Sequence, residues 1–284
     1  MHSITLPHAL VLTAWFLKNR LWRAIDSRLF TWVLLFSISQ ACLAQTEEII
    51  ALTTPRGSQQ LYLYASPQIQ HPLNNAAVLL FNGGAGVVGL SRGIPRPGAN
   101  FLVRSRAYFA ARGLHVAVYD PSPDIGPMRD YDRMSEAHRL EVAALIADLR
   151  RRSGVEKVYL VGTSRGTVSA AYVGLHMGDA VVLTSSLFVA GGRNGYGLSG
   201  FDYKALNKPL LFVHHVDDAC AYTPYSEAKK LANTYPLITV LGGENFTGDP
   251  CEPWHAHGFR GREQATVNAI VDWLESGKVS PSIE

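Results

Sequence analysis

Short apolar runs alternate with amphipathic segments along the chain from about residue 77 onward. Continuous apolar runs of this length are typical of strands buried on both faces, and the segments between them have helical spacing. The runs predicted as strands are Ala77–Phe81, Leu114–Tyr119, Val158–Val161, Ala180–Thr184, Leu210–Val213 and Leu237–Leu241. The segments predicted as helices are Phe101–Arg112, Ser135–Gly154, Thr167–Met177, Thr223–Thr234 and Arg262–Leu274. This alternation predicts an α/β fold with a mainly parallel central sheet and helices on both faces.

Two extended segments precede this pattern. Ile49–Thr54 and Gln60–Ala65 flank Pro55-Arg56-Gly57, a sequence typical of a turn. We expect them to form an antiparallel hairpin at one edge of the sheet. No internal repeat or linker interrupts the remaining chain, so residues 45–284 are predicted to be a single domain.

The N-terminal segment has the pattern of an export signal. Basic residues up to Arg28 precede an apolar run from Leu29 to Ser39, and small residues surround Ala44. We expect a signal peptide over residues 1–44, cleaved after Ala44, and a mature protein that is periplasmic or secreted. An N-terminal membrane anchor is one alternative, although the apolar run is short for a spanning helix. A lipoprotein signal ending at Cys42 is another, although Ser39 stands where a large aliphatic residue is expected.

Charge is concentrated in the predicted signal. The chain is 47% hydrophobic and 17% charged, as expected of a folded globular protein, and its formal net charge is +3. The first 44 residues account for that excess through Lys18, Arg20, Arg23 and Arg28 against Asp26. The remainder is neutral, so nucleic acid is not an expected partner. No later segment is long and apolar enough to span a membrane.

Cysteine usage agrees with export. Removal of the signal also removes Cys42 and leaves Cys220 and Cys251, an even pair in an oxidising compartment. A disulfide between the two is predicted, provided that the fold brings them together.

Two segments match the G-x-S-x-G pattern of a nucleophile elbow, Gly162–Gly166 and Gly89–Gly93. The elbow must connect a strand to a helix, because its sharp turn lifts the serine hydroxyl above the sheet edge. Ser164 follows an apolar strand and precedes a helix. Ser91 is followed by residues 94–98, which contain two prolines and cannot begin an ordinary helix. Ser164 is therefore the predicted nucleophile, and Ser91 a loop serine.

A serine nucleophile needs a base, and the base needs an orienting acid. His214-His215-Val216-Asp217-Asp218 places two carboxylates just beyond a buried strand, where catalytic groups gather in α/β sheets. Farther along, residues 254–259 place His255 and His257 in a loop before the last helix. The order of serine, acid and histidine is the order found in this type of fold.

Taken together, these motifs resemble the α/β-hydrolase superfamily, and most closely its serine esterases and lipases, over residues 47–276. The resemblance implies a single-domain α/β-hydrolase fold. In that family a His-Gly-x-x-Asp segment commonly follows the strand that carries the acid. Here it implies Asp218 as the acid, with His215 in place of the glycine and Asp217 as a solvated neighbour or cap. A His-Gly-Phe segment often holds the base, which favours His257 over His255.

The same resemblance implies an oxyanion hole. Family members usually have His-Gly and a further small residue after the third strand, and Asn82-Gly83-Gly84 stands there in this chain. Because the donors are main-chain groups, asparagine in place of histidine should matter little. The implied donors are the N–H groups of Gly84 and Arg165. A phosphate-binding loop is the alternative, but the spaced glycines and the Lys-Ser/Thr ending are missing.

The expected activity is hydrolysis of a carboxylic ester in a small-molecule acyl substrate, through an acyl-enzyme and without a cofactor or metal. His255-Ala256-His257 lacks metal-site spacing such as His-Glu-x-x-His. Two alternatives remain open: a peptide or amide hydrolase with the same triad, and a catalytically silent binding protein. The short segment between Ser185 and Lys208 argues against a large lid, and Val87–Asn100 is a possible wall of an open site. The sequence gives no basis for an oligomeric state.

Overall fold

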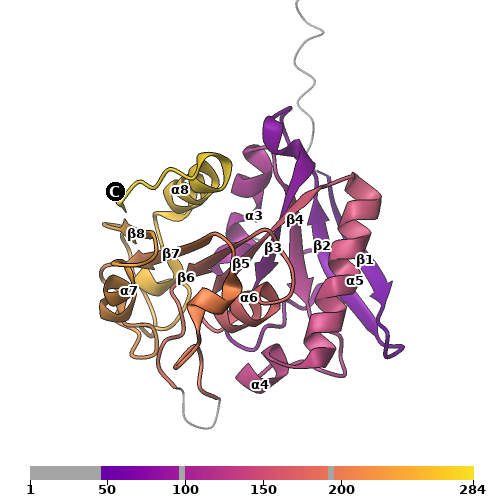
Figure 1. The fold of residues 1–284 in the computed structure, drawn as a ribbon, viewed down its shortest axis with the longest axis horizontal. Coiled ribbons are helices and arrows are strands. Elements are labelled where there is room, and N and C mark those ends of the chain that lie inside the picture. The colour runs from indigo at the N-terminus through magenta and orange to yellow at the C-terminus, as the bar shows by residue number, and fades with distance from the viewer. Residues whose placement is uncertain (1–45, 96–99, 191–194) are drawn as a thin grey trace, which may run out of the picture. The chain divides into compact units, whose positions relative to one another are not determined.

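The computed structural model describes residues 46–95, 100–190 and 195–284 (Figure 1). The predicted signal peptide, residues 1–44, lies outside the described residues. The strands are β1 (Glu47–Thr53), β2 (Gln59–Ala65), β3 (Ala76–Phe81), β4 (His115–Asp120), β5 (Lys157–Thr163), β6 (Ala180–Thr184), β7 (Leu210–His215), β8 (Leu237–Val240) and β9 (Ser282–Ile283). The helices are α3 (Phe101–Ala111), α4 (Asp130–Arg133), α5 (Glu136–Ser153), α6 (Gly166–Gly174), α7 (Tyr225–Leu231) and α8 (Glu263–Ser276).

The described strands form one sheet in the order β1-β2-β4-β3-β5-β6-β7-β8-β9. Strand β2 pairs antiparallel with both β1 and β4, and every other neighbouring pair is parallel. This confirms the predicted mainly parallel sheet with an antiparallel N-terminal hairpin at its edge. Strand β9 was not predicted, because two residues are too few to show a pattern.

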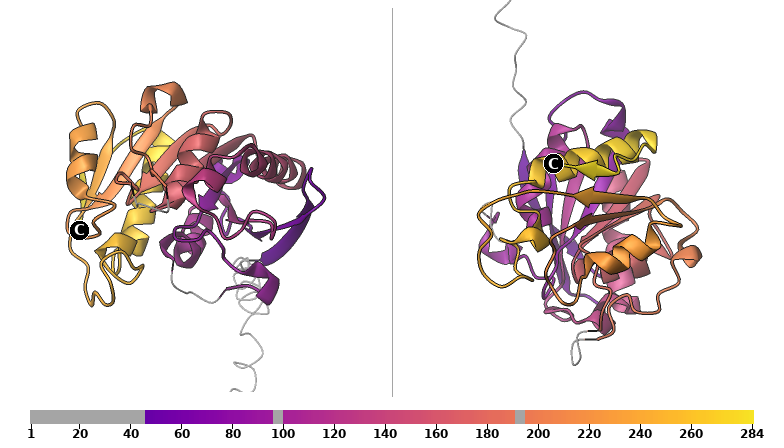
Figure 2. Two further views of the ribbon diagram at one scale, coloured as in Figure 1. Left: turned by 90° about the horizontal axis from the view of Figure 1, so that it is seen from below. Right: turned by 90° about the vertical axis from the view of Figure 1, so that its left-hand side faces the viewer.

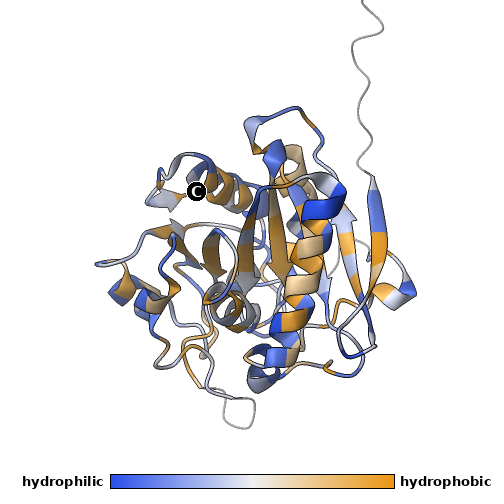
Figure 3. Cartoon of the chain, turned by 45° about the vertical axis from the view of Figure 1, so that its right-hand side comes forward, coloured by the Kyte–Doolittle hydropathy of each residue, from blue (hydrophilic) through white to orange (hydrophobic). Residues whose placement is uncertain are grey.

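The sheet is covered on both faces, as its continuous apolar strands require (Figure 2). In β3 the side chains of Ala76, Val78 and Leu80 pack in one core cluster with residues of α3 and α8. The alternating side chains, such as Leu79 and Phe81, pack in a second cluster with residues of α5 and α6. The central strands, such as β3, are apolar throughout, whereas the edge strand β1 contains polar residues and the long helix α5 is apolar on one side only (Figure 3).

Local signals fix the ends of the helices. The Ser135 hydroxyl accepts the N–H of His138 and begins α5, and Gly154 ends that helix at φ 67°. Helix α7 is shorter than predicted. It begins after Pro224, because the preceding Thr223 is held in a turn by an N–H bond to the Cys220 carbonyl (3.1 Å).

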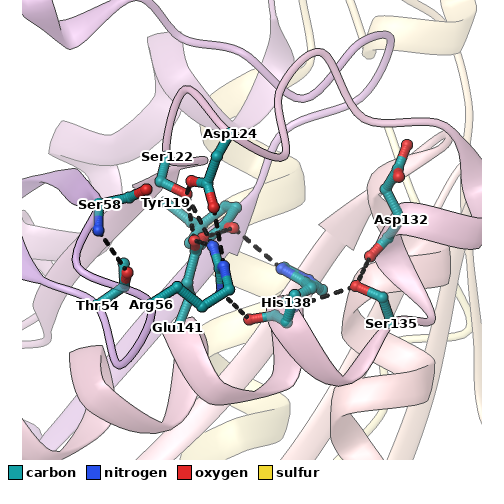
Figure 4. Close-up of polar contacts among 11 residues, drawn as sticks. Thr54, Arg56, Ser58, Tyr119, Ser122, Asp124, Asp132, Ser135, His138 and Glu141 are labelled. Atoms are coloured by element: carbon teal, nitrogen blue, oxygen red, sulfur yellow. Dashed lines mark hydrogen bonds and ion pairs between the residues drawn. The ribbon is translucent and has the colours of Figure 1, made fainter.

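A buried polar cluster ties the N-terminal hairpin to the rest of the domain (Figure 4). Glu141 of α5 is fully buried, and one of its oxygens accepts the hydroxyl of Tyr119 at 2.6 Å. Its other oxygen accepts from Ser122 and from Arg56 of the hairpin turn. Arg56 also binds Asp124 at 2.8 Å. A buried carboxylate is stable only when it is paired and hydrogen-bonded, and this cluster supplies both.

His138 extends the cluster on the other side of Tyr119. Its Nδ1 lies 3.0 Å from the Tyr119 hydroxyl, whose single proton goes to Glu141, so Nδ1 is the donor. Burial, and then the charge of Arg133, lower the pKa of His138 to about 3. His138 is therefore a neutral structural side chain.

Replacing Glu141 with leucine should destabilise the domain by about 3 kcal/mol, because Arg56 and the two hydroxyls lose their common acceptor. The free energy of unfolding from urea denaturation measures the effect. The matched control is Glu136→Ala on the same helix, whose side chain is exposed and should change the midpoint little. Equal effects of the two variants would contradict a structural role for the cluster.

Candidate active site

The predicted nucleophile lies on a strained turn. Ser164 connects β5 to α6 and has φ 52°, a left-handed conformation that is costly for a residue with a side chain. Its N–H donates to the carbonyl of Thr184 on β6 at 3.0 Å. A Cβ on Gly162 would lie 2.4 Å from the Gly166 carbonyl oxygen, so only glycine fits the turn there. The strand–elbow–helix context predicted for Ser164 is confirmed.

The competing motif has a different environment. Ser91 lies in a short 3₁₀ segment, Leu90–Arg92, within the loop after β3, and is exposed. This loop is fixed by the Asp120 carboxylate, which accepts the N–H groups of Val88 and Leu90 at 2.7 and 2.8 Å. Ser91 is therefore a loop serine, as expected.

Asp218 and His257 form a buried pair. The His257 Nδ1 lies 3.0 Å from the Asp218 Oδ2, although 39 residues separate the two in sequence. The Thr223 hydroxyl donates to the same carboxylate oxygen at 2.9 Å and lies 3.1 Å from the His257 Nδ1. The other oxygen accepts the N–H of Cys220 at 3.1 Å. This arrangement fixes the ring and leaves its Nε2 for a further partner.

The Asp218 carboxylate is held in its ionised form. Burial alone would raise its pKa, but hydrogen bonds and charge from His214 and His257 outweigh burial and hold the pKa well below its usual range. The His214 Nε2 lies 3.3 Å from the carboxylate and 2.7 Å from the Thr223 carbonyl oxygen. Since a carbonyl only accepts, His214 carries its proton on Nε2 and can orient the acid.

The alternative acid and base lie elsewhere. Asp217 is exposed, and its N–H donates to the His215 Nδ1 at 3.0 Å. His255 stacks on Phe246 with ring centroids 5.1 Å apart. The geometry therefore pairs Asp218 with His257, the combination that the family resemblance favours.

Ser164 and His257 line one cavity of about 270 Å³, together with Gly83 and Gly84. Within the described residues the two side chains do not hydrogen-bond directly. Catalytic hydrogen bonds are often long before substrate binds, so shared access to the cavity is the relevant observation. The assignment of the triad stays a prediction.

The two predicted oxyanion donors flank the nucleophile. Gly84 has φ 55°, and the Cβ that Gly83 lacks would lie 3.2 Å from the Ser164 Cβ, so this loop packs against the elbow. Arg165 is the N-cap residue of α6, where the helix dipole favours negative charge. In the part of the chain that the structure describes, neither N–H donates a hydrogen bond to the protein. Both remain available to a substrate oxygen.

A buried arginine that the sequence analysis missed supports this loop. Arg133 of α4 donates to the Gly84 carbonyl at 3.1 Å and to the Ser169 hydroxyl at 3.0 Å. Burial, and then the charge of Arg165, lower the pKa of Arg133 to about 10. Its partners come from the loop after β3 and from α6, so no local pattern could have indicated its role.

A second arginine supports the loop of the predicted base. Arg104 of α3 donates to the carbonyls of Pro253 and Gly258, which lie on either side of His257 in sequence. It also pairs with Glu263 at 3.0 Å and lies over the Trp254 ring at 4.8 Å. The sequence analysis did not single out Arg104, because its carbonyl partners lie far along the chain.

The predicted disulfide is present. Cys220 and Cys251 are bonded, with Cα atoms 4.6 Å apart, and so join the loop of Asp218 to the loop of His257. Cys251 also lines the cavity that Ser164 lines.

Neither a metal site nor a membrane span is found in residues 46–95, 100–190 and 195–284. No three His, Cys, Asp or Glu side chains gather there in a way that could hold a metal ion. No helix of this part is long and apolar enough to cross a bilayer.

The double variant Cys220→Ser/Cys251→Ser should lower the free energy of unfolding by about 3 to 4 kcal/mol, since the bond closes a loop of 31 residues. Urea denaturation measures the difference. The wild-type protein with its disulfide reduced is the matched control and should unfold at the same midpoint as the variant. An unchanged midpoint in the variant would contradict a stabilising role.

Comparisons with known proteins give the fold. No protein-family model matches the sequence, and no curated protein is significantly similar to it. A solved α/β serine hydrolase without a lid, from Xanthomonas campestris, matches 78% of this chain and 94% of its own, with 12% identity and a TM-score of 0.53. The match to the esterase domain of a Rhodothermus marinus protein covers 80% of this chain and 97% of that domain, with 11% identity and a TM-score of 0.53. An acylaminoacyl peptidase from Pyrococcus horikoshii matches 85% of this chain and 42% of its own, with 12% identity and a TM-score of 0.52. The chain therefore has the fold of the α/β serine hydrolases.

Proposed function

We propose that the protein is a serine hydrolase that cleaves carboxylic esters through an acyl-enzyme. The observation that carries the proposal is the buried Asp218–His257 pair, 3.0 Å apart, at a cavity that the strained Ser164 also lines. Esterases and peptidases both occur among the structural neighbours, which is consistent with acyl transfer but shows only the fold. Ester cleavage remains the leading choice and amide cleavage the alternative.

In the proposed mechanism, the His257 Nε2 takes the proton of the Ser164 hydroxyl as the oxygen attacks the substrate carbonyl carbon. Asp218 holds the imidazole through Nδ1 and stabilises its protonated form. The N–H groups of Gly84 and Arg165 bind the oxygen that becomes negative. His257 then gives its proton to the leaving alcohol, and an ester of Ser164 remains.

Water completes the cycle. His257 takes a proton from a water molecule as that water attacks the acyl carbon of the Ser164 ester. The same two N–H groups bind the second oxyanion. Its collapse releases the carboxylic acid and returns the proton to Ser164, so the enzyme ends the cycle unchanged.

Thr223 and His214 are proposed to position the acid rather than to react. The Thr223 hydroxyl donates to Asp218, and the His214 Nε2, which donates to the Thr223 carbonyl, lies 3.3 Å from the same carboxylate. Neither residue lines the cavity that Ser164 lines. These contacts offset the desolvation of a buried carboxylate. An acid held in this way keeps the His257 ring in one orientation while its charge changes.

The variant Ser164→Ala should lower kcat for p-nitrophenyl acetate hydrolysis by at least about 10⁴-fold, because the nucleophile is lost. Asp218→Asn should have an effect of similar size by favouring the wrong tautomer of His257. Asp217→Asn, one residue away and exposed, is the matched control and should retain activity.

Retained activity in Ser164→Ala would place the nucleophile elsewhere. If the wild-type protein cleaves p-nitroanilides but not esters, the amide alternative holds. Inactivity toward both classes would favour a silent binding protein.

We also propose that the protein is exported after removal of residues 1–44. The Cys220–Cys251 disulfide supports an oxidising compartment. Intact-mass measurement of the protein recovered from a secreting bacterial host should give a chain that begins near Gln45. A full-length chain retained with the membrane would instead support an N-terminal anchor.

A further inference from the structure

A second cavity lies beside the proposed catalytic cavity. It has a volume of about 460 Å³, within the range of small-molecule sites. Val87, in the loop after β3, lines both cavities and is 44% exposed. An exposed valine at the boundary of two cavities offers an apolar surface over which a ligand could pass from one to the other.

The surface that lines the second cavity is mainly apolar. Leu61 of β2, Val87, and the prolines 121, 123 and 127 of the loop after β4 all line it. These segments belong to the N-terminal hairpin and to the connections after β3 and β4, and all are among the described residues. A surface of this composition fits an aliphatic ligand.

Buried polar groups in the wall already have partners within the protein. The Asp120 carboxylate accepts three N–H groups, those of Val88, Gly89 and Leu90, at 2.7 to 3.1 Å. The Ser122 hydroxyl is bonded to Asp124 and to the buried Glu141 (Figure 4). Neither of these side chains is left to recognise a charged ligand. The other polar side chains in the lining, Gln59 and Ser91, carry no charge, so the lining favours an uncharged, mainly apolar group.

Strand order sets how far the second cavity lies from the nucleophile. Ser164 follows β5 and Asp120 ends β4, with β3 between them. Neighbouring strands are about 4.8 Å apart, so the two positions are separated by about 10 Å across the sheet. Three bonds of an extended chain span about 3.5 Å, so roughly eight or nine bonds are needed to reach the cavity.

We propose that the second cavity is the subsite for the distal part of a long aliphatic chain of the ester substrate. The inference rests on the proposed hydrolase function and adds a substrate class to it: esters whose acid or alcohol carries an unbranched chain of roughly ten carbons or more. Short esters occupy only the catalytic cavity. The aliphatic chain of the substrate passes over Val87 from one cavity to the other. The hydrogen bonds of Asp120 to the next three residues hold this loop in place.

Substitutions at two exposed residues that line the cavity test the proposed subsite. Ser91 and Pro123 both line the cavity and are exposed, so Ser91→Trp should fill it and Pro123→Asp should add a charge without disturbing the core. Ser280→Trp is the control for a surface tryptophan, because Ser280 is exposed and lines neither cavity.

The measured quantity is the ratio of kcat/KM for p-nitrophenyl dodecanoate to that for p-nitrophenyl acetate. We expect Ser91→Trp and Pro123→Asp each to lower this ratio at least tenfold, and Ser280→Trp to leave it unchanged. A parallel series of dodecyl and ethyl acetates shows whether the acid or the alcohol carries the chain. Ratios that stay at the wild-type value in both series and both variants would overturn the proposal.

A binding measurement separates this inference from the proposed activity. Isothermal titration calorimetry of dodecanoate with Ser164→Ala requires no catalysis. Adding Ser91→Trp to that variant should weaken binding at least tenfold, and equal affinities would overturn the subsite. If the wild-type protein cleaves no ester, the proposed function fails and this titration still decides the subsite.

Discussion

The close approach of helix α6 to strand β3 is the constraint on which the site depends. A Cβ on Gly166 would lie 2.1 Å from the Phe81 carbonyl oxygen, a distance that no side chain can occupy. Glycine there lets the helix begin directly above the strand ends. That approach gives Ser164 its left-handed conformation and brings the loop after β3 against it. The proposed nucleophile and both proposed oxyanion donors therefore share one rigid junction.

Around that junction the charged groups are buried and paired. Asp218 has three donors from separate residues, and Arg133 donates to the Gly84 carbonyl of the loop after β3. Each group is costly to bury alone, and each is stable because its partners have fixed positions. Electrostatic preorganisation of this kind is what acyl transfer requires, because the donors do not have to reorient as charge develops.

The sequence predicted most of the fold, because its strands are continuous apolar runs and its helices have clear ends. Ser164 could be found because an elbow needs a strand before it and a helix after it. Asp218 and His257 came from the family pattern, since spacing alone does not distinguish them from Asp217 and His255.

Supporting residues could not be found in this way. Arg104 and Arg133 donate to backbone carbonyls of segments that are distant in sequence. Thr223 was predicted to begin a helix, but helix α7 begins only at Tyr225, after Pro224. The local sequence around an arginine is the same whether its side chain faces solvent or is buried against a remote carbonyl. The second cavity was missed for a related reason, since its lining comes from strand β2 and from the two loops after β3 and β4.

The Cys220–Cys251 disulfide makes full assembly of the proposed site depend on oxidation. Before oxidation, the loops of Asp218 and His257 are held together by hydrogen bonds and packing alone. After oxidation they are one covalent unit. A reduced chain thus has a less firmly held Asp218–His257 pair than an oxidised one. On the proposed export, oxidation would complete the proposed acid–base pair only after the chain has left the producing cell.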